Sequence, residues 1–431
     1  MSDILKYKIY ICIFIAINLY FLITKSIGYL YVLLFIFFIT NAAKLLLFIF
    51  SLFIKKHRIY HFNRLKNLPI YTILIPLYKE KYNSIRNLLT TIYNFNYDKE
   101  KLDVILLLEE DDQDTIANAT KLEKDFKFNK LIIENSIPKT KPKACNIGLK
   151  YAKGQYLTIY DAEDIPDKNQ LKKALLEFQE LPEEYICLQA RLNYYNKNEN
   201  ILTKCFSIEY SLYFEYYLQI FSYLFNFFPL SGTSNHFKVD KLRKLGGWDA
   251  YNVTEDAELG MRIGFNKYKM KTIDSTTYEE AVTNIHSWIK QRSRWIKGFL
   301  HTYMKYMSTP IQTFKNFGLM KFLLMQLSIG CTAILPLLYA FFFFVFIQKS
   351  NPLIDLLNIA NLYSYLVLEI IILLFFFWKN KRTIEYDIFI APYFLLYTML
   401  PFYVSYISIF EFFINTSHWR KTEHCLSKYV K

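Results

Sequence analysis

The chain has 431 residues, of which 53% are hydrophobic, 19% aromatic and 21% charged. This composition excludes an ordinary soluble protein, which is less apolar, and a pure membrane bundle, which carries fewer charges. Because the apolar residues concentrate in 8–54 and 318–414 and the charges lie between them, we expect a soluble domain flanked by membrane segments.

The formal net charge of +14 raises the possibility of a nucleic-acid partner. The sequence has no zinc-finger spacing and no recognition-helix pattern, so we expect no nucleic-acid binding. We interpret the lysines and arginines as marking the cytoplasmic ends of membrane helices and their contact with lipid headgroups. The six cysteines form no C-x-x-C pair, which favours free thiols in a reducing compartment.

Two apolar runs open the chain, over 8–24 and 28–54, and two bilayer spans of about 20 residues each fit there. The first run lacks a small-residue cleavage site, so we expect an anchor hairpin and not a removed signal peptide. The basic cluster at 55–58 places the region that follows in the cytoplasm. The first predicted domain is therefore a transmembrane hairpin over 1–58.

The second predicted domain, 59–307, alternates short apolar runs with amphipathic stretches. Strands are expected at 71–76, 103–108, 130–133 and 156–160, and helices at 81–96, 115–127 and 143–152. This alternation is typical of βαβ units and a parallel sheet. Ligands of open α/β sheets bind beyond the carboxyl ends of the strands. The acidic groups at 109–112 and 161–164 follow two of these strands, so we expect them to share one crevice.

Residues 205–230 are rich in Tyr, Phe and Leu but carry two glutamates, which favours a helix near the membrane surface over a span. The third predicted domain, 308–431, contains apolar segments at 322–347, 358–378 and 387–413 and a basic tail. Three full spans would place that tail outside, against the positive-inside rule. Because Pro392 and Pro401 interrupt the last segment, we prefer an interfacial or re-entrant hairpin that leaves the tail in the cytoplasm.

Asp161 and Glu163 lie two residues apart on the turn after the strand expected at 156–160. Carboxylates so spaced can both face a hard cation such as Mg²⁺ or Mn²⁺. Such an ion would bridge diphosphate oxygens and stabilise a leaving group. A solvated acidic turn is the alternative, and the apolar strand favours the metal site because it buries one end of the turn.

Asp111 and Asp112 also end a strand, where a carboxylate can accept hydrogen bonds from a uracil or a ribose. The alternative is an N-terminal cap for the next helix, a role that Asp114 could fill instead. We favour Asp112 as a ligand contact. Asp256, after Glu255, is either a helix cap or a first-turn acid that serves as general base in the pocket, and the sequence leaves both readings open.

The motif Gln291-Arg-Ser-Arg-Trp295 lies in a basic, helical stretch. Arg294 could neutralise a diphosphate, because its guanidinium is permanently charged and binds in a bidentate way. Trp295 could stack on a sugar face, and a cationic interfacial helix is the alternative. The basic turn around Lys141 precedes a helix and could bind phosphate, with a solvated loop as the alternative. Gly232 could let the backbone approach a ligand closely.

Taken together and in this order, TILIPLYKE, LLLEEDD, KTKPKACNIGL, YDAEDIPD, SGTSNHF, GGWDAYNVTEDAELGMR and QRSRW resemble the membrane-bound family 2 glycosyltransferases. These are relatives of cellulose, chitin and hyaluronan synthases and of bacterial β-glucan synthases. The resemblance covers about 70–300 and implies a GT-A fold, a Rossmann-like α/β domain with a mostly parallel sheet, flanked by transmembrane helices. It implies an inverting transfer of a hexose from a nucleotide-diphosphate sugar, a UDP-sugar, to a polysaccharide or glycan acceptor, with a β-linked product.

The resemblance also implies roles for individual residues. It makes Asp256, with Glu255, the catalytic pair, and Asp161 and Glu163 the ligands of Mg²⁺ or Mn²⁺. Nucleotide or substrate binding falls to Pro76, Tyr78, Glu80, Asp111, Asp112, Lys141, Lys143 and Asp161. The acceptor and diphosphate end falls to Gly232, Thr233, Gln291, Arg294 and Trp295. Glu163 departs from the family pattern, which has Asp there; it keeps the charge and lengthens the arm.

Two other functions are compatible with parts of the sequence. One is a single, non-processive transfer to a lipid or lipid-linked acceptor. The other is a transporter, against which the spans contain few ionisable residues. With about two spans before the catalytic domain, a polymer channel would need an oligomer or an accessory export partner. We expect an enzyme integral to a bacterial-type inner membrane, with the lipid bilayer as a partner and the catalytic domain in the cytoplasm.

Overall fold

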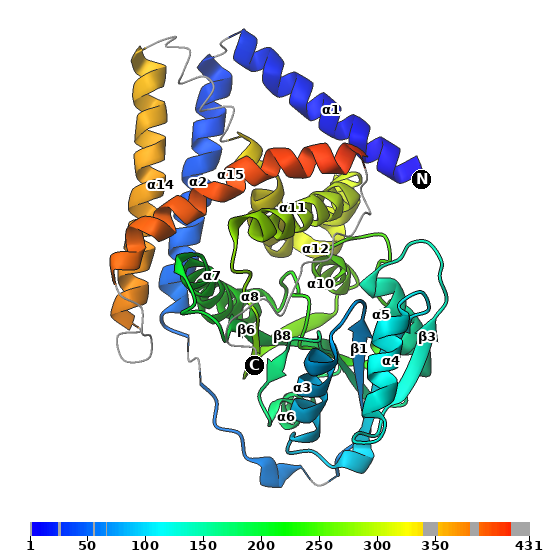
Figure 1. Ribbon diagram of the computed structural model, residues 1–431. Helices are drawn as coiled ribbons and strands as arrows, with labels where there is room; N and C mark the ends of the chain where they lie inside the picture. The colour runs from blue at the N-terminus through cyan, green and yellow to red at the C-terminus, as the bar shows by residue number, and fades with distance from the viewer. Residues whose placement is uncertain are drawn as a thin grey trace.

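The computed structural model describes residues 2–24, 27–54, 57–65, 67–338, 352–379 and 388–414. Its centre is one eight-stranded sheet in the order β3-β2-β1-β4-β7-β6-β8-β5 (Figure 1). The strands are β1 (Tyr71–Leu77), β2 (Leu102–Glu109), β3 (Asn129–Ile133), β4 (Tyr156–Ile159), β5 (Ile165–Pro166), β6 (Tyr185–Tyr194), β7 (Asn235–Lys238) and β8 (Lys269–Glu279). The strands β1 to β4 are mutually parallel, β7 is antiparallel to β4 and β6, and β6 and β8 are parallel. The predicted GT-A-like, mostly parallel α/β sheet is confirmed.

Helices cover both faces of the sheet. They are α3 (Tyr82–Tyr93), α4 (Gln113–Leu122), α5 (Lys141–Tyr151), α6 (Gln170–Glu180), α9 (Val239–Lys244) and α10 (Glu255–Phe265). Alternate residues of β1 divide between the two faces, as the period of two in a strand requires. Ile73 and Ile75 pack with Leu88 of α3, whereas Leu74 packs with Leu149 of α5. The hydrophobic core therefore fixes where β1, β2 and β4 end, and the loops beyond these ends face α10 and α11 (Ile285–Met307).

Residues 201–225 form one helical run between the sheet and the apolar helices. The run comprises α7 (Ile201–Leu212), the π-helical turn η3 (Tyr213–Tyr217) and α8 (Leu218–Phe225). It begins at a capping box, in which Asn200 accepts from the amide of Thr203 and Thr203 accepts from the amide of Asn200, both at 3.0 Å. The run packs on β6 and contacts α2 (Ile27–Ser51) and α15 (Ala391–Ile414).

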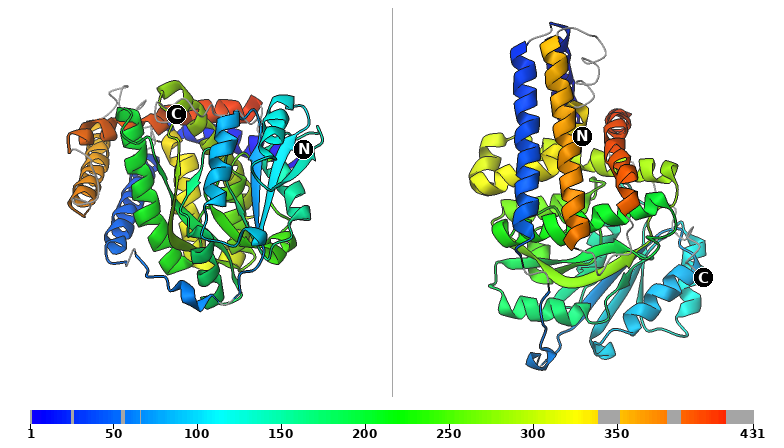
Figure 2. Two further views of the ribbon diagram at one scale, coloured as in Figure 1. Left: turned by 60° about the horizontal axis from the view of Figure 1, so that its bottom comes forward. Right: turned by 90° about the vertical axis from the view of Figure 1, so that its left-hand side faces the viewer.

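The apolar helices gather at one side of the sheet domain, opposite α3 and α6 (Figures 1 and 2). Besides α2 and α15, they are α1 (Ser2–Ile23), α12 (Pro310–Met325) and α14 (Pro352–Lys379). Within the residues that the structure describes, four segments are long and apolar enough to cross a membrane by length and composition, namely Asp3–Phe21, Tyr31–Ser51, Pro310–Leu338 and Ala391–Ile414. Gly318, with a φ of 70°, breaks the third of these.

The helix α15 lies at a steep angle to the paired helices α2 and α14 in Figure 1. The segment 387–413, for which we expected an interfacial or re-entrant hairpin, forms one continuous helix from Ala391 to Ile414 with Pro401 inside it, so the predicted hairpin is wrong. The membrane topology itself stays a prediction. The expected segment 322–347 is described only as far as residue 338, and the basic tail lies outside the described residues. The predicted domain boundaries at residues 58 and 307 also stay predictions.

Candidate active site

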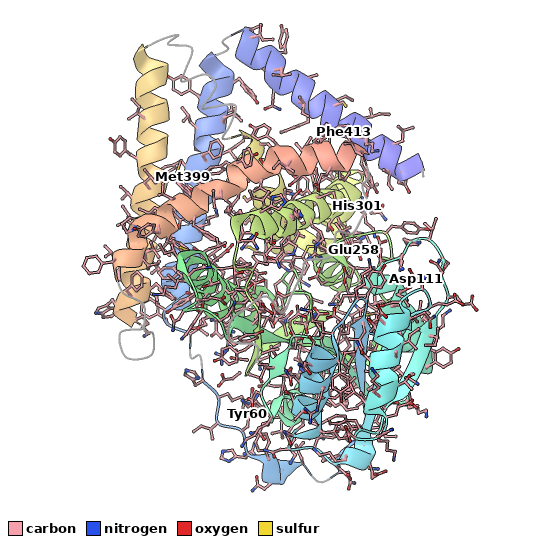
Figure 3. All side chains as sticks on the ribbon, viewed as in Figure 1. Tyr60, Asp111, Glu258, His301, Met399 and Phe413 are labelled. Atoms are coloured by element: carbon pink, nitrogen blue, oxygen red, sulfur yellow. The ribbon has the colours of Figure 1, made fainter. Side chains whose placement is uncertain are left out.

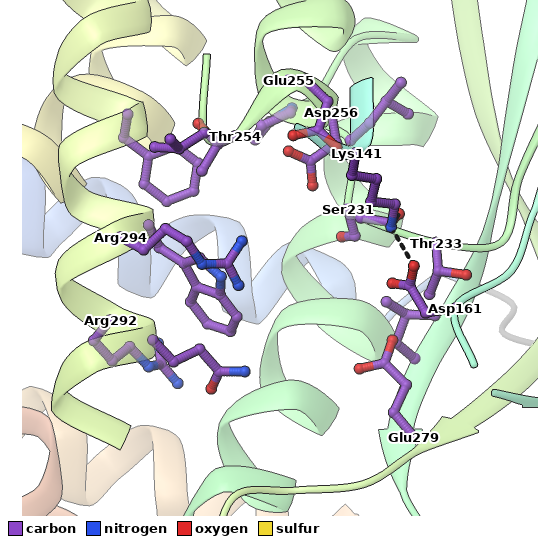
Figure 4. Close-up of a pocket in the computed structure, with 18 of the residues that line it drawn as sticks. Lys141, Asp161, Ser231, Thr233, Thr254, Glu255, Asp256, Glu279, Arg292 and Arg294 are labelled. Carbon is purple, nitrogen blue, oxygen red and sulfur yellow. Dashed lines mark hydrogen bonds and ion pairs between the residues drawn. The ribbon is translucent and has the colours of Figure 1, made fainter. Parts of the chain in front are cut away.

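A cavity of about 870 Å³ lies between the carboxyl ends of the central strands and helices α10, α11, α2 and α14 (Figure 4). Most of the sequence-predicted site residues line it. They are Pro76, Tyr78, Glu80, Lys141, Asp161, Glu163, Gly232, Thr233, Glu255, Asp256, Gln291, Arg294 and Trp295. The fold thus brings together side chains from β1, the loops after β4 and before β7, and the helices α5, α10 and α11.

The acidic turn after β4 places two of its carboxylates at the cavity and uses a third to hold its shape. Asp164 is buried and accepts hydrogen bonds from the hydroxyl of Thr233 and, at 2.8 Å, from the amide of Asp161. Asp161 and Glu163 line the cavity. Lys141 donates to Asp161 Oδ1 and, at 2.9 Å, to the carbonyl of Gly232 (Figure 4). The turn is therefore a fixed structure that presents oxygen ligands.

A further carboxylate, Glu279 at the end of β8, lies beside this turn (Figure 4). Burial raises the pKa of Glu279 well above its usual range, and the charges of Asp164, Glu163 and Asp161 add to the rise. Within the described residues, no three His, Cys, Asp or Glu side chains are arranged to hold a metal ion by themselves. The concentration of hard oxygen donors fits Mg²⁺ or Mn²⁺ if a bound diphosphate completes the ligand set.

Glu255 and Asp256 occupy the first turn of α10 and face the cavity (Figure 4). Thr254 is the N-cap residue and makes no side-chain capping bond. Burial raises the pKa of both carboxyls, and the charge of Asp256 adds to the rise at Glu255, whose pKa is about 7. Lys141 and Arg294 act in the opposite direction on both. A methyl group added at Gly232 would lie 3.5 Å from Asp256 Oδ2, so the 231–233 loop runs next to this carboxylate.

Helix α11 carries the Gln291–Trp295 motif along the opposite wall (Figure 4). Arg294 points into the cavity, and its buried Nε has no hydrogen-bond partner among the described residues. Burial lowers the pKa of Arg294, while Glu255 and Asp256 raise it. Gln291 Oε1 is also buried without a partner in the described part of the chain. Buried polar groups without a protein partner, such as these two in one wall, indicate a binding site for a polar ligand.

Gly298, one turn after this motif, lets α11 approach α10. A Cβ atom at Gly298 would lie 2.3 Å from Thr254 Oγ1, far inside van der Waals contact. Because Thr254 precedes Glu255 directly, this contact sets the spacing between Arg294 and the two carboxylates.

The Gly298→Ala substitution should therefore push the two helices apart and lower the turnover rate by about 10²-fold, because a displacement of about 1 Å can have that effect. The measurement is kcat together with the melting temperature. Gly28→Ala in α2, where nothing lies within 4 Å, is the control. Unchanged kcat in Gly298→Ala would contradict the role of this contact.

Three predicted residues do not line the cavity. Asp112 is the N-cap of α4, accepting from the amides of Thr115 (3.3 Å) and Lys79, so the capping alternative is correct for it. Asp111, which Figure 3 labels, is exposed and pairs with Lys139, which does line the cavity. Lys143 donates to two carbonyls of the 134–136 loop, at 2.9 and 3.1 Å. Their contact with a nucleotide stays a prediction, and the structure gives Asp112 and Lys143 structural partners.

Glu109, which ends β2, lines the cavity, although the sequence did not single it out within the acidic run 109–112. Its Oε2 is buried and has no partner among the described residues. Burial raises the pKa of Glu109, and Lys143 and Lys139 oppose the rise. The alternation of β2 could have singled it out, because Glu109 lies on the same face as Leu107, which packs against α5. Glu279 carried no comparable signal, since no motif surrounds it.

Comparisons with known proteins agree with this geometry. A family model described as "Glycosyl transferase family group 2" matches residues 156–406. The "Probable glycosyltransferase YdaM" of Bacillus subtilis (strain 168) is 25% identical over 248 residues. That alignment covers 57% of this chain and 58% of the relative, so the chain matches less than two thirds of its relative's length.

Among solved structures, the mannosyltransferase PcManGT from Pyrobaculum calidifontis, in complex with GDP-Man and Mn²⁺, has a TM-score of 0.59 and 16% identity. The superposition covers 89% of this chain and 99% of that chain, which shows a shared fold. Fold and cavity define a GT-A glycosyltransferase. The chain belongs to glycosyl transferase family group 2.

Proposed function

We propose that this enzyme transfers a hexose from a nucleotide-diphosphate sugar to a hydroxyl group of a glycan acceptor, with inversion at the anomeric carbon. The observation that carries the proposal is that carboxylate and cationic side chains border one cavity. Glu255 and Asp256 lie at the start of α10, and the Lys141–Asp161 pair and Arg294 border the same space. A general base beside cationic groups is what displacement of a diphosphate by a hydroxyl requires.

Asp256 is the proposed general base. It takes the proton of the acceptor hydroxyl as the oxygen attacks the anomeric carbon, and the nucleoside diphosphate leaves from the opposite side. Arg294 and Lys141 offset the negative charge that develops on the departing diphosphate. A single displacement of an α-linked donor gives the β-linked product that the family resemblance implies.

Asp161 and Glu163 are the proposed ligands of a divalent cation, Mg²⁺ or Mn²⁺. A bound cation supplies Lewis-acid stabilisation of the diphosphate oxygens. The P. calidifontis mannosyltransferase was solved with GDP-Man and Mn²⁺, which supports a nucleotide-diphosphate sugar and a divalent cation for this chain as well. The resemblance to cellulose, chitin and hyaluronan synthases favours UDP-hexose as the donor. Glu109, whose Oε2 has no partner among the described residues, is the proposed acceptor of a hydrogen bond from an N–H group of the donor's nucleobase.

A transfer to a lipid-linked acceptor is the second candidate, and the shape of the cavity favours it. Besides Trp295, the cavity is lined by Lys44 of α2 and Ile372 of α14, both on apolar helices. We propose that the enzyme works at a membrane, with its sheet domain in the cytoplasm. An acceptor that arrives along the bilayer could enter from the side of these apolar helices.

The test offers radiolabelled UDP- and GDP-sugars to membranes that carry the wild-type protein, with Mg²⁺ or Mn²⁺ and then with a chelator. We expect incorporation from one donor that is lost on chelation and restored by adding the cation back. The size of the product separates a polymer from a single added sugar. Absence of incorporation and of nucleotide binding with every donor would contradict the proposal.

The pH dependence of kcat/KM should show an acidic limb at unusually high pH. The base must be ionised to act, and both Asp256 and Glu255 have raised pKa values, with Glu255 at about 7. Activity should therefore be present above this region and fall about tenfold per pH unit below it. Because the two carboxyls interact, the limb reports the pair. An acidic limb at the pH of an ordinary exposed carboxylate would contradict the raised pKa values.

A further inference from the structure

Three helices that are far apart in the sequence meet at one ion pair of the Gln291–Trp295 motif, in which the arginine is buried and its carboxylate partner is partly exposed. Arg292 of α11 donates to both carboxylate oxygens of Glu209 of α7, at 2.7 Å for Nη1 to Oε1. Its Nη2 also donates to the hydroxyl oxygen of Tyr397 of α15, at 2.9 Å. The Tyr397 hydroxyl in turn donates to Glu209, and Trp288 Nε1 donates to Tyr397 at 3.1 Å. We call Glu209, Arg292 and Tyr397 the clamp.

The guanidinium of the clamp is enclosed by aromatic rings, one of which belongs to the proposed acceptor site. The Arg292 Cζ atom lies 4.6 Å from the ring centroid of Phe206, 5.1 Å from that of Trp288 and 4.6 Å from that of Trp295. Trp295 lines the cavity. The cation therefore lies against the ring that we propose stacks on the acceptor sugar, and cation–π attraction holds the two together.

The next residue of α11 connects to α15 as well. Ser293 donates to Glu411 Oε2 at 2.9 Å and lies 3.4 Å from the hydroxyl oxygen of Ser408. Residues 292 and 293 thus attach to two points of α15, and the next two residues, Arg294 and Trp295, line the cavity, as Arg292 also does. Two attachments on adjacent residues fix the rotation of α11 about its own axis, and so the direction of the side chains that follow.

We propose that the clamp positions Trp295, and that α15 thereby sets the geometry of the acceptor end of the active site. An apolar contact of equal volume would hold the three helices together as well. The guanidinium fork differs because it accepts only one planar orientation of its carboxylate partner. Glu209, Arg292 and Tyr397 are positioning residues in this inference, which rests on the proposed function of the same cavity.

The test uses full-length protein with Arg292→Lys, Glu209→Gln and Tyr397→Phe. We expect the KM for the acceptor to rise and kcat to fall, together about tenfold to a hundredfold in kcat/KM for the acceptor. The KM for the donor and the acceptor-independent hydrolysis of the nucleotide sugar should be unchanged. The exchange of charges in Arg292→Glu with Glu209→Arg should recover part of the loss relative to Arg292→Glu alone.

Arg191→Lys is the matched control, because Arg191 forms a comparably enclosed ion pair with Asp274 between β6 and β8, away from the cavity. We expect it to lower the melting temperature without changing the KM for the acceptor. A parallel fall of donor hydrolysis and acceptor transfer in the clamp variants, as in a general loss of structure, would overturn the inference.

A second readout separates failure of the clamp from failure of the proposed function. Each variant is also made with the additional substitution Trp295→Phe. The emission of Trp295 is the spectrum of the variant minus the spectrum of its Trp295→Phe counterpart. We expect Arg292→Lys and Tyr397→Phe to change the emission maximum and the quenching of Trp295, and Arg191→Lys to leave them unaltered. An unchanged Trp295 signal in both clamp variants would refute the inference even if no sugar transfer were detected in any protein.

Discussion

Asp256→Asn should abolish sugar transfer, with a loss of about 10²–10⁴-fold in kcat, and leave nucleotide binding intact. Asn has nearly the same shape as Asp but cannot take up the proton of the acceptor hydroxyl. Asp256 lies in the first turn of α10, next to the 231–233 loop, and the Lys141–Asp161 pair belongs to other elements. The groups proposed to hold the nucleotide should therefore stay in place.

The measurement combines initial rates of transfer with equilibrium binding of the nucleoside diphosphate. Asp114→Asn is the matched control, since Asp114 is also a first-turn acid, of α4, but is exposed and does not line the cavity. We expect wild-type rates from it. If Asp256→Asn lost nucleotide binding together with transfer, Asp256 would be a binding or structural residue, and the assignment as base would be wrong.

Arg294→Ala should lower kcat by about 10²–10³-fold, as removal of a donor aimed at developing charge does in other enzymes. The side chain points into the cavity, and its buried Nε has no hydrogen-bond partner among the described residues, so it is available to the diphosphate. Arg294→Lys should recover only a small part of the rate, because an ammonium group cannot reproduce the bidentate contact.

Steady-state kinetics with the donor varied at a fixed acceptor concentration provide this measurement. Lys290→Ala is the control on the same helix, because Lys290 is exposed and lies outside the cavity lining. A large rise in the KM for the donor with unchanged kcat would show that Arg294 contributes uniform binding of the substrate and not stabilisation of the transition state.

The parallel half of the fold was accessible from the sequence because its signals are local. The strands at β1, β2 and β4 are short apolar runs, each followed by polar residues, and α3 repeats apolar residues at helical spacing. By contrast, β6 and β8 were not predicted. The pattern of β8, KMKTIDSTTYE, is polar, and this strand is stabilised by pairing with β6, which is a long-range contact.

The same difference between local sequence signals and long-range contacts applies to the residues of the candidate site. The turn with Asp161 and Glu163 and the motif with Arg294 and Trp295 are contiguous in sequence, and both line the cavity. Which acid of the 109–112 run lines the cavity depends on the pleat of β2: Glu109 lines it, whereas Asp112, the predicted ligand contact, caps α4. Contacts such as that between Gly298 and Thr254 depend on how two helices approach each other, and no local pattern records them.

The walls of the cavity have a practical consequence for any attempt to shorten the protein. Lys44 and Leu47 come from α2, and Phe394 and Thr398 come from α15, so both ends of the chain contribute to the chamber in which the reaction is proposed to occur. A water-soluble fragment that keeps only the sheet domain would have an open side where those helices now lie. With the proposed membrane location of these helices, the choice of detergent or bilayer is expected to change the walls of the cavity, and so the measured activity.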